Sequence, residues 1–202
     1  MPARPDNVGW VYDSRRSKFY MFPGFYFGTQ GPQPPTPAGM GCASAGSVTN
    51  SAVIFDPVTK LYTPATWPAP PGGRPGDNSA YGGDIGSDFA VYDPIGDMVY
   101  RWRVGALERL DLTANSWPSL INASTFFGDA TYDFHSDQPA IDIIGRAVYV
   151  VQRNFGGSGW WLIKYNIGSQ NMTRVAIPAE LSATLPTQTD FETYTVFDSA
   201  SR

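Results

Sequence analysis

FAVYDPIGDMVYRWRVGALERLDLTANSW, residues 89–117, is the stretch of sequence that decides the fold. It contains two apolar segments that end in aspartate, at Asp93 and Asp111, and each is followed by a short turn and a second segment. A carboxylate at the end of a strand can accept backbone N–H groups of the turn, and Gly96 suits a left-handed turn position. The stretch therefore predicts two consecutive β-hairpins, which make four antiparallel strands.

The same spacing recurs along the 202 residues of the chain. The first hairpin reads Val-Tyr-Asp at 11–13 and 91–93 and Ala-Ile-Asp at 140–142, each with a tyrosine seven residues after the Asp, and it starts again as Val-Phe-Asp at 196–198. The second hairpin returns as Ile-Phe-Asp at 54–56 and Lys-Tyr-Asn at 164–166. The expected turn-capping residues are Asp13, Asp56, Asp93, Asp111, Asp142, Asn166 and Asp198.

Four antiparallel strands in a repeat of about 50 residues are typical of propeller blades. We expect one all-β segment over 1–202, with blades at about 8–68, 87–118 and 138–178 and a partial blade at 191–202. The Gly- and Pro-rich insertions at 25–52 and 68–88 cannot continue a sheet. A β-sandwich with coincidental spacing is the alternative. Because closed propellers need about four blades or more, the predicted array is incomplete or is completed by another chain.

Composition excludes several classes of protein. Only 16 % of the residues are charged, and lysine and glutamate are scarce, which argues against a helical bundle. A net charge of −4 argues against a nucleic-acid partner, which would need a basic stripe. No apolar run approaches the roughly 18 residues of a membrane span. The sequence shows no signal peptide, and its single cysteine, Cys42, excludes an intrachain disulfide.

The unit at 89–117 resembles a Kelch repeat of the kind found in galactose-oxidase-type propellers. In that family a Tyr-Asp turn, here Tyr92-Asp93, precedes one strand, and a later segment that begins Asp-Leu and ends in Trp, here 111–117, closes the blade. The other copies are degenerate, because Tyr62 and Met172 stand at the place of Trp117. The resemblance implies propeller geometry across most of the chain.

The resemblance also raises an alternative function, a fragment of a galactose-oxidase-like carbohydrate-active enzyme. The copper site of that family takes two histidines, tyrosines and a Tyr–Cys crosslink. This chain has one histidine, His135, and one cysteine, Cys42. We therefore expect no catalytic residues, no enzyme activity and no cofactor.

Two pairs of residues are candidates for ligand binding. Asp88 and Asp137 each stand five residues before the turn acid of their unit, where they would lie at one mouth of a central channel and contact a polar ligand such as a sugar. Capping of backbone N–H groups at strand starts is the alternative role. Trp102 and Trp160 are candidates for stacking on a glycan, with core packing as the alternative.

The densest ionisable cluster consists of Asp129, Asp133 and Asp137, with His135 among them. Carboxylate oxygens of this kind are the ligands that Ca²⁺ prefers. The spacing matches no calcium-loop pattern, so solvated loop carboxylates are the favoured interpretation of this cluster.

These observations favour a non-enzymatic structural or recognition module of a larger extracellular assembly. Scarce lysine and glutamate, Gly/Pro-rich insertions and an incomplete ring fit a virion structural protein, such as a phage tail or head appendage. The expected partners are other protein subunits or missing blades, with glycans as a further candidate, and the expected location is the virion or the extracellular space.

Overall fold

A computed structural model describes residues 10–21, 53–67, 90–103, 105–118, 120–128, 138–153 and 160–182. Within these ranges the chain forms three four-stranded antiparallel sheets, which we call blades 1, 2 and 3 in chain order. In each blade the strands lie in the order of the sequence. The prediction of an all-β fold made of four-stranded antiparallel blades is confirmed.

The elements alternate short strands with tight turns. Blade 1 contains β1 (Trp10–Asp13), β2 (Lys18–Met21), β3 (Val53–Asp56) and β4 (Leu61–Pro64). Blade 2 contains β5 (Ala90–Asp93), β6 (Met98–Arg103), β7 (Ala106–Asp111) and β8 (Leu120–Asn122), followed by the short helix α1 (Ala123–Phe127). Blade 3 contains β9 (Ala140–Asp142), β10 (Ala147–Arg153), β11 (Trp160–Asn166) and β12 (Asn171–Ala176), followed by α2 (Ala179–Ser182). Neither of these two helices is long and apolar enough to cross a membrane.

The fourth strand of blade 2 lies further along the chain than the repeat spacing suggests. The turn after Asp111 closes through a single bridge to Ser116, and β8 begins only at Leu120. Pro118 stands between them, and proline has no N–H with which to continue a strand ladder. Blade 2 therefore extends to 122 rather than 118.

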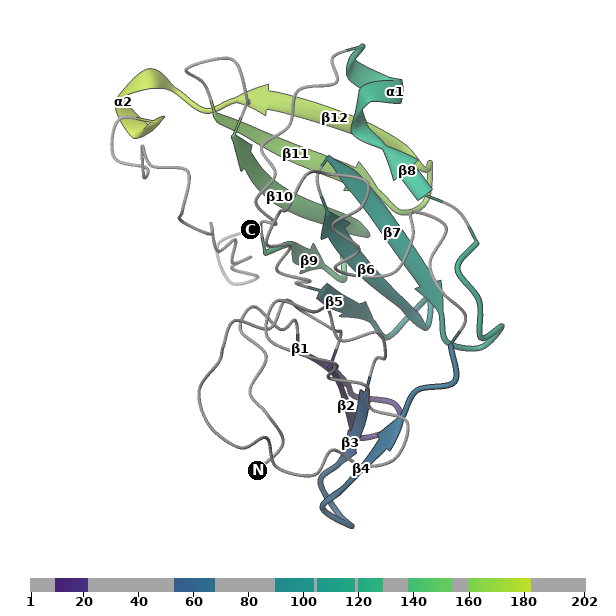
Figure 1. Ribbon diagram of the computed structural model, residues 1–202. Helices are drawn as coiled ribbons and strands as arrows, with labels where there is room; N and C mark the ends of the chain where they lie inside the picture. Colours follow the sequence, from purple (N-terminus) through teal and green to yellow (C-terminus); the bar gives the residue numbers. More distant parts are fainter. Residues whose placement is uncertain are drawn as a thin grey trace, which may run out of the picture.

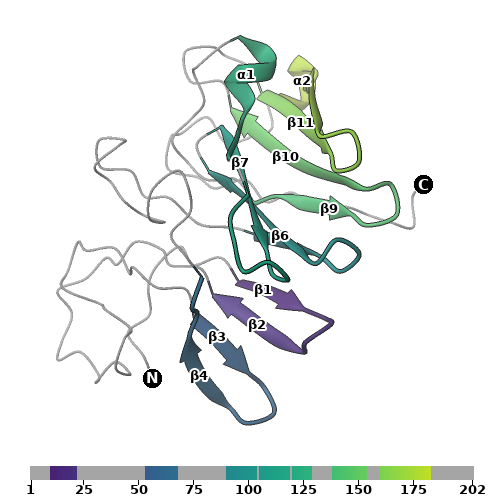
Figure 2. The same ribbon diagram turned by 90° about the vertical axis from the view of Figure 1, so that its right-hand side faces the viewer.

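The three blades follow one another in the manner of a propeller, without closing a ring. Their first strands lie side by side, with β5 in contact with both β1 and β9. Figures 1 and 2 show the sheets stacked in chain order, with blade 2 between the other two. The described part of the chain is thus an incomplete, propeller-like array.

Each blade has two faces, because successive side chains of a strand point to opposite sides. We call the side that carries the residue just before the first turn acid (Tyr12, Tyr92, Ile141) the back face. The other side, which carries the turn acid itself, is the front face. The front face of blade 1 packs on the back face of blade 2 in a core of Val11, Tyr20, Ala90, Tyr92, Val99 and Leu110.

Blades 2 and 3 meet in the same way, front face to back face. Their core contains Tyr100, Trp102 and Leu107 from blade 2 and Val148, Val150, Ile163, Tyr165 and Met172 from blade 3. The tyrosine seven residues after the turn acid, Tyr20 or Tyr100, is buried in its interface. The core of the described molecule therefore lies between the blades, as it does in a propeller.

All six hairpin turns of the described blades share one conformation. The fourth turn residue is left-handed in every case, with φ between 52° and 59°, and none of the six is glycine; they are Ser17, Lys60, Asp97, Asn115, Arg146 and Gln170. Such a conformation costs a non-glycine residue roughly 1–2 kcal/mol. The Asp or Asn that opens the turn offsets this cost, because its Oδ1 accepts one or two N–H groups of the turn.

Candidate functional site: charged turns between the blades

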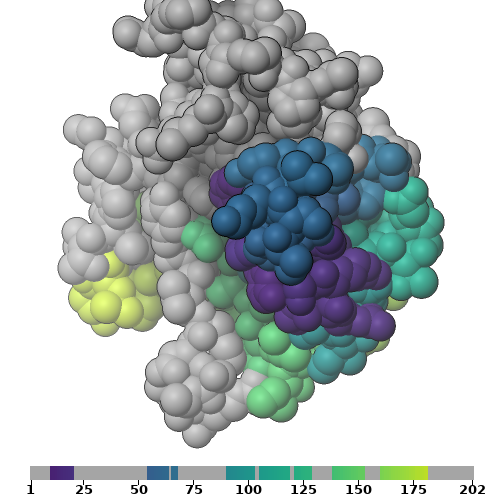
Figure 3. Space-filling model, turned by 90° about the horizontal axis from the view of Figure 1, so that it is seen from below, coloured from purple at the N-terminus to yellow at the C-terminus, as the bar shows by residue number. Residues whose placement is uncertain are grey.

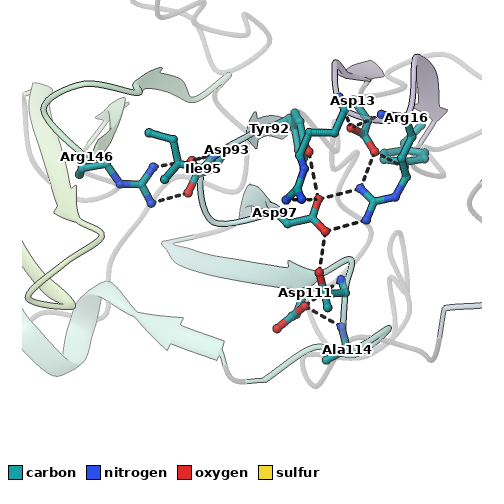
Figure 4. Close-up of polar contacts among 12 residues, drawn as sticks. Asp13, Arg16, Tyr92, Asp93, Ile95, Asp97, Asp111, Ala114 and Arg146 are labelled. Carbon is teal, nitrogen blue, oxygen red and sulfur yellow. Dashed lines mark hydrogen bonds and ion pairs between the residues drawn. The ribbon is translucent and has the colours of Figure 1, made fainter.

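Polar and charged side chains from four hairpin turns meet at one edge of the blades (Figure 4). The turns are β1–β2 of blade 1, β5–β6 and β7–β8 of blade 2, and β9–β10 of blade 3. Each turn is fixed locally by its capping acid.

Between blades 1 and 2, Arg16 joins two buried carboxylates. Its Nη1 donates to Asp13 Oδ2 at 2.8 Å and to Asp97 Oδ1 at 2.6 Å, and its Nη2 donates to Asp97 Oδ2 at 2.6 Å. Asp13 is 0 % exposed and Asp97 is 3 % exposed. Bidentate Arg–carboxylate pairs of this kind are among the strongest polar contacts in proteins.

Hydroxyl groups donate further hydrogen bonds to both carboxylates. The Tyr20 hydroxyl donates to Asp13 Oδ2 at 2.5 Å. The Tyr92 hydroxyl donates to Asp97 Oδ1 at 3.0 Å, and Thr113 Oγ1 donates to Asp97 Oδ2 at 2.7 Å. The hydrogen bonds to Asp97 therefore join the β5–β6 turn to β5 and to the β7–β8 turn within blade 2, and to the β1–β2 turn of blade 1.

Between blades 2 and 3, Arg146 binds the fully buried Asp93. Its Nη2 donates to Asp93 Oδ2 at 2.6 Å, and its Nη1 donates to Oδ1. Gly96 makes room for this pair, because a Cβ at that position would lie only 2.6 Å from Asp93 Oδ2. The glycine is required by this close approach rather than by a positive φ.

The two contacts use equivalent positions with opposite charges. Asp97 and Arg146 are both the fourth, left-handed residue of the first turn in their blades. Their carbonyl oxygens are held alike, by Leu112 N at 3.1 Å and by Ile167 N at 2.9 Å. From this common position Arg146 reaches back to the acid of blade 2, whereas Asp97 reaches back to a base of blade 1.

The surroundings of these carboxylates favour their charged form. The Arg16 guanidinium holds the pKa of Asp97 well below its usual range, with help from Thr113 and Tyr92 against burial. Burial alone would raise the pKa of Asp13, but hydrogen bonds from Tyr20 and Arg16 outweigh it, and the net pKa is lowered. Burial and the neighbouring Asp13 raise the pKa of the Tyr20 hydroxyl.

We expect the free energy of unfolding to fall as the pH is lowered from about 4 toward 2. The folded-state pKa values of Asp13 and Asp97 are depressed, so their stabilisation is present above the ordinary carboxyl pKa and is lost as they protonate. Urea titrations at a series of pH values would measure this slope. An Asp97→Asn variant should be less stable at neutral pH and show a shallower slope, whereas an unchanged slope would contradict the role of Asp97.

A second polar contact joins blades 2 and 3 inside their core. Trp102 Nε1 donates to Gln152 Oε1 at 2.5 Å, and both side chains are buried. Within blade 2, the cross-strand neighbours Arg101 and Glu108 form a buried ion pair. No spacing in the sequence predicts these contacts.

Two candidate glycan-stacking residues are buried in the described blades. Trp102 is 1 % exposed and belongs to the core between blades 2 and 3, so its ring offers no face to a sugar. Trp160 is 7 % exposed and is likewise unsuited to stacking on a ligand from solution. Strand alternation explains Trp102, because it lies two residues after Tyr100 and therefore on the same, front face.

The remaining predicted site residues lie outside the described residues. They are the candidate channel acids Asp88 and Asp137, the candidate Ca²⁺ ligands Asp129, Asp133 and Asp137, the turn acid Asp198, and His135 and Cys42. Within the described ranges, no three His, Cys, Asp or Glu side chains are grouped as metal ligands would be.

The back face of blade 1 carries a row of four aromatic side chains. Tyr12, Phe19, Phe55 and Tyr62 are successive cross-strand partners on β1 to β4. Their neighbouring ring centroids lie 4.8, 6.2 and 4.7 Å apart. Trp10, Phe19, Phe55 and Tyr62 line a shallow hollow of about 310 Å³. In Figure 3 blade 1 (purple and blue) lies in front, on the side turned away from the other blades.

This row and Trp10, which lies beside it on the same face, are exposed to an unusual degree for large aromatic residues. Trp10 is 48 % exposed, Tyr12 is 47 % exposed and Tyr62 is 36 % exposed. A contiguous apolar patch of this kind marks an interaction surface more often than a bare solvent face. The described residues that line the hollow are all aromatic.

The sheets and their order define an all-β protein with a propeller-like fold. No family model matches the chain, and no curated protein matches it. Among solved structures, apo AztD from Citrobacter koseri matches at 12 % identity and a TM-score of 0.39 over 86 % of this chain and 48 % of that chain. Hydrazine synthase of Kuenenia stuttgartiensis matches at 9 % identity and a TM-score of 0.38 over 88 % of this chain and 51 % of that chain.

This chain thus spans about half the length of the two solved chains. Similarity at this level carries no information on activity, ligand or partner.

Proposed function

We propose that the chain is a non-enzymatic structural module, built of Kelch-like blades, that works inside a larger assembly. The observation that carries this proposal is the aromatic back face of blade 1. The equivalent faces of blades 2 and 3 are buried by a neighbouring blade, whereas this one is not covered by any described blade. A blade face of this composition needs a partner.

The polar contacts support a structural role as well. Arg16, Asp97 and Arg146 hold neighbouring blades together through bidentate pairs. An inter-blade ion pair fixes the relative placement of two rigid sheets, which is the property that a subunit of a particle needs. The Kelch relation rests on the Tyr-Asp turn before β6 and the Asp-Leu…Trp segment after β7.

For the assembly itself we propose a virion or another extracellular structure, with contacts to neighbouring subunits or glycans. Scarce lysine and glutamate and the Gly/Pro-rich insertions support this placement. A fragment of a galactose-oxidase-like enzyme is the competing function.

In native extracts of its source, we expect the chain to migrate in a particle much larger than one copy. Gel filtration of the clarified extract, with antibody detection of the fractions, measures this directly. Gel filtration of the same extract in denaturant, calibrated with denatured standards, provides the control for the mass of the free chain.

Two results would overturn the proposed function. One is migration of the native chain as a single free copy. The other is stoichiometric copper on the purified chain together with oxidation of galactose to the aldehyde, a signal that the Cys42→Ser variant loses.

A further inference from the structure

We propose that the interface between blades 2 and 3 holds a small carboxylate anion, bound by the side-chain amide of Gln152 and the indole of Trp161. The site lies at the edge of blade 3 opposite the charged turns, because Gln152 is near the end of β10 that is far from the β9–β10 turn. This inference goes beyond the proposed structural function and does not depend on it.

The Gln152 side chain is completely buried and has a donor without a partner. Its exposed fraction is 0 %. Trp102 Nε1 donates to Gln152 Oε1 at 2.5 Å, and an indole N–H can only donate, so this contact fixes which end of the amide faces Trp102. The other end, Nε2, has no acceptor among the described residues. Because burying an amide donor without an acceptor is costly, the interface lacks a group that would accept there.

A second donor of the same kind lies beside the first. Trp161 on β11 is the cross-strand partner of Gln152, so both side chains leave the sheet on the back face, which packs on blade 2. The Cβ atoms of such partners lie about 4.5–5.5 Å apart. Trp161 Nε1 is buried and likewise lacks an acceptor in the described part of the chain. One acceptor group placed between the two side chains would serve both donors.

A positive charge is close to these donors. The Arg174 guanidinium, on β12, places its Cζ 4.3 Å from the ring centroid of Trp161 and 4.6 Å from that of Phe127. Phe127 belongs to α1, which lies against β12 (Figure 1). Trp161 and Arg174 are both partly exposed, so a small ligand can reach the site from solvent.

This chemistry selects an anion that only accepts hydrogen bonds. Both unpartnered atoms are N–H donors, and a carboxylate offers acceptor oxygens and no proton of its own. A water molecule in the same place would bring two protons that need acceptors. The charge of Arg174 favours an anion over a neutral acceptor, and hydrogen bonds to a charged acceptor are the stronger ones. A small carboxylate such as acetate therefore fits this site best.

Nuclear magnetic resonance can detect the bound anion at the indole itself. In a nitrogen–proton correlation spectrum of the purified full chain, each of the six tryptophans contributes an indole N–H signal. When sodium acetate replaces sodium chloride at constant ionic strength, we expect the Trp161 signal to move downfield until it saturates. The signal of Trp10, which is 48 % exposed on blade 1, should not move. Trp161→Phe assigns the signal, because it removes the N–H and keeps an aromatic ring beside Arg174.

Isothermal titration calorimetry gives the affinity and the effect of each donor. Trp161→Phe should weaken acetate binding by about tenfold, since one hydrogen bond to a charged acceptor is lost. Gln152→Glu should abolish binding, because Oε1 still accepts from Trp102 while the donor end of the amide becomes a carboxylate oxygen. Trp10→Phe is the matched control and should bind acetate as the wild type does. Thermal unfolding in chloride confirms that each variant is folded.

Two results would overturn the inference. One is a Trp161 signal that does not respond when acetate replaces chloride, and the other is acetate binding that Trp161→Phe leaves unchanged. If Gln152→Glu does not fold, the Trp161 signal and Trp161→Phe still decide. Neither result bears on the proposed structural function, which the mass of the native particle tests separately.

Discussion

Replacing Arg16 by glycine should lower the free energy of unfolding by about 3 kcal/mol. The substitution removes the only guanidinium that joins Asp13 to Asp97 among the described residues, and it leaves two buried carboxylates without their shared counter-charge. Arg16 itself is exposed, but removing the partner of a buried carboxylate costs more than the pair contributes, because the remaining charge stays desolvated. Urea unfolding of the purified chain at neutral pH measures the loss.

The Arg146–Asp93 contact between blades 2 and 3 suggests a substitution that restores the lost stability. Arg146 of blade 3, at the left-handed turn position, binds Asp93 of blade 2, and Gly96, three residues after Asp93 as Arg16 is after Asp13, makes room for that pair. Arg16→Gly combined with Asp97→Arg would convert the contact between blades 1 and 2 to that pattern, with glycine at 16 leaving room for the Asp13 carboxylate to turn. We therefore expect the double variant to be more stable than either single variant.

The double-mutant cycle gives the decisive number. Asp97→Arg alone should also destabilise the chain, because it sets a third guanidinium beside Arg15 and Arg16 and removes the bidentate pair to Arg16. The coupling free energy between the two substitutions should be about 2 kcal/mol in favour of the double variant. Additive losses would mean that the two contacts are not interchangeable and that the repeat equivalence is wrong at this edge.

The hairpins could be predicted from the sequence because their cause is local. An Asp such as Asp93 ends a strand, and its Oδ1 meets an N–H two residues further on, so the spacing alone indicates the turn. Asn166 keeps the same acceptor, which is why it holds its turn without a charge. The fold class follows because this capped turn occurs six times in the described blades and each turn joins two antiparallel strands.

The contacts between turns of neighbouring blades could not be predicted from the sequence in the same way. Whether the fourth turn residue reaches the neighbouring blade depends on how two sheets stack, which no local spacing records. One signal was nevertheless present: Arg146 and Asp97 have opposite charges at equivalent positions, and Arg16 supplies the missing base one blade earlier. The exposure of the aromatic row on blade 1 depends on the same stacking, because its equivalents in the other blades are buried.

Replacing Arg146 by asparagine should destabilise the chain by about 2–3 kcal/mol, whereas Gln170→Asn should change stability by less than about 0.5 kcal/mol. The two residues occupy the same turn position in the two hairpins of blade 3, with φ of 53° and 52°, so the backbone cost is matched. Asparagine tolerates this left-handed conformation. Only Arg146 carries a bidentate pair to the buried Asp93, and Gln170 is exposed.

Adding Asp93→Asn to Arg146→Asn separates the ion pair from the turn. Asn166 shows that an amide can accept the N–H of such a turn, so Asp93→Asn should preserve the hairpin while removing the unpaired buried charge. The double variant should therefore recover most of the stability that Arg146→Asn loses, in urea unfolding at neutral pH. If the double variant is no more stable than Arg146→Asn, or if Gln170→Asn costs as much, then the turn conformation rather than the charge across the blades holds blades 2 and 3 together.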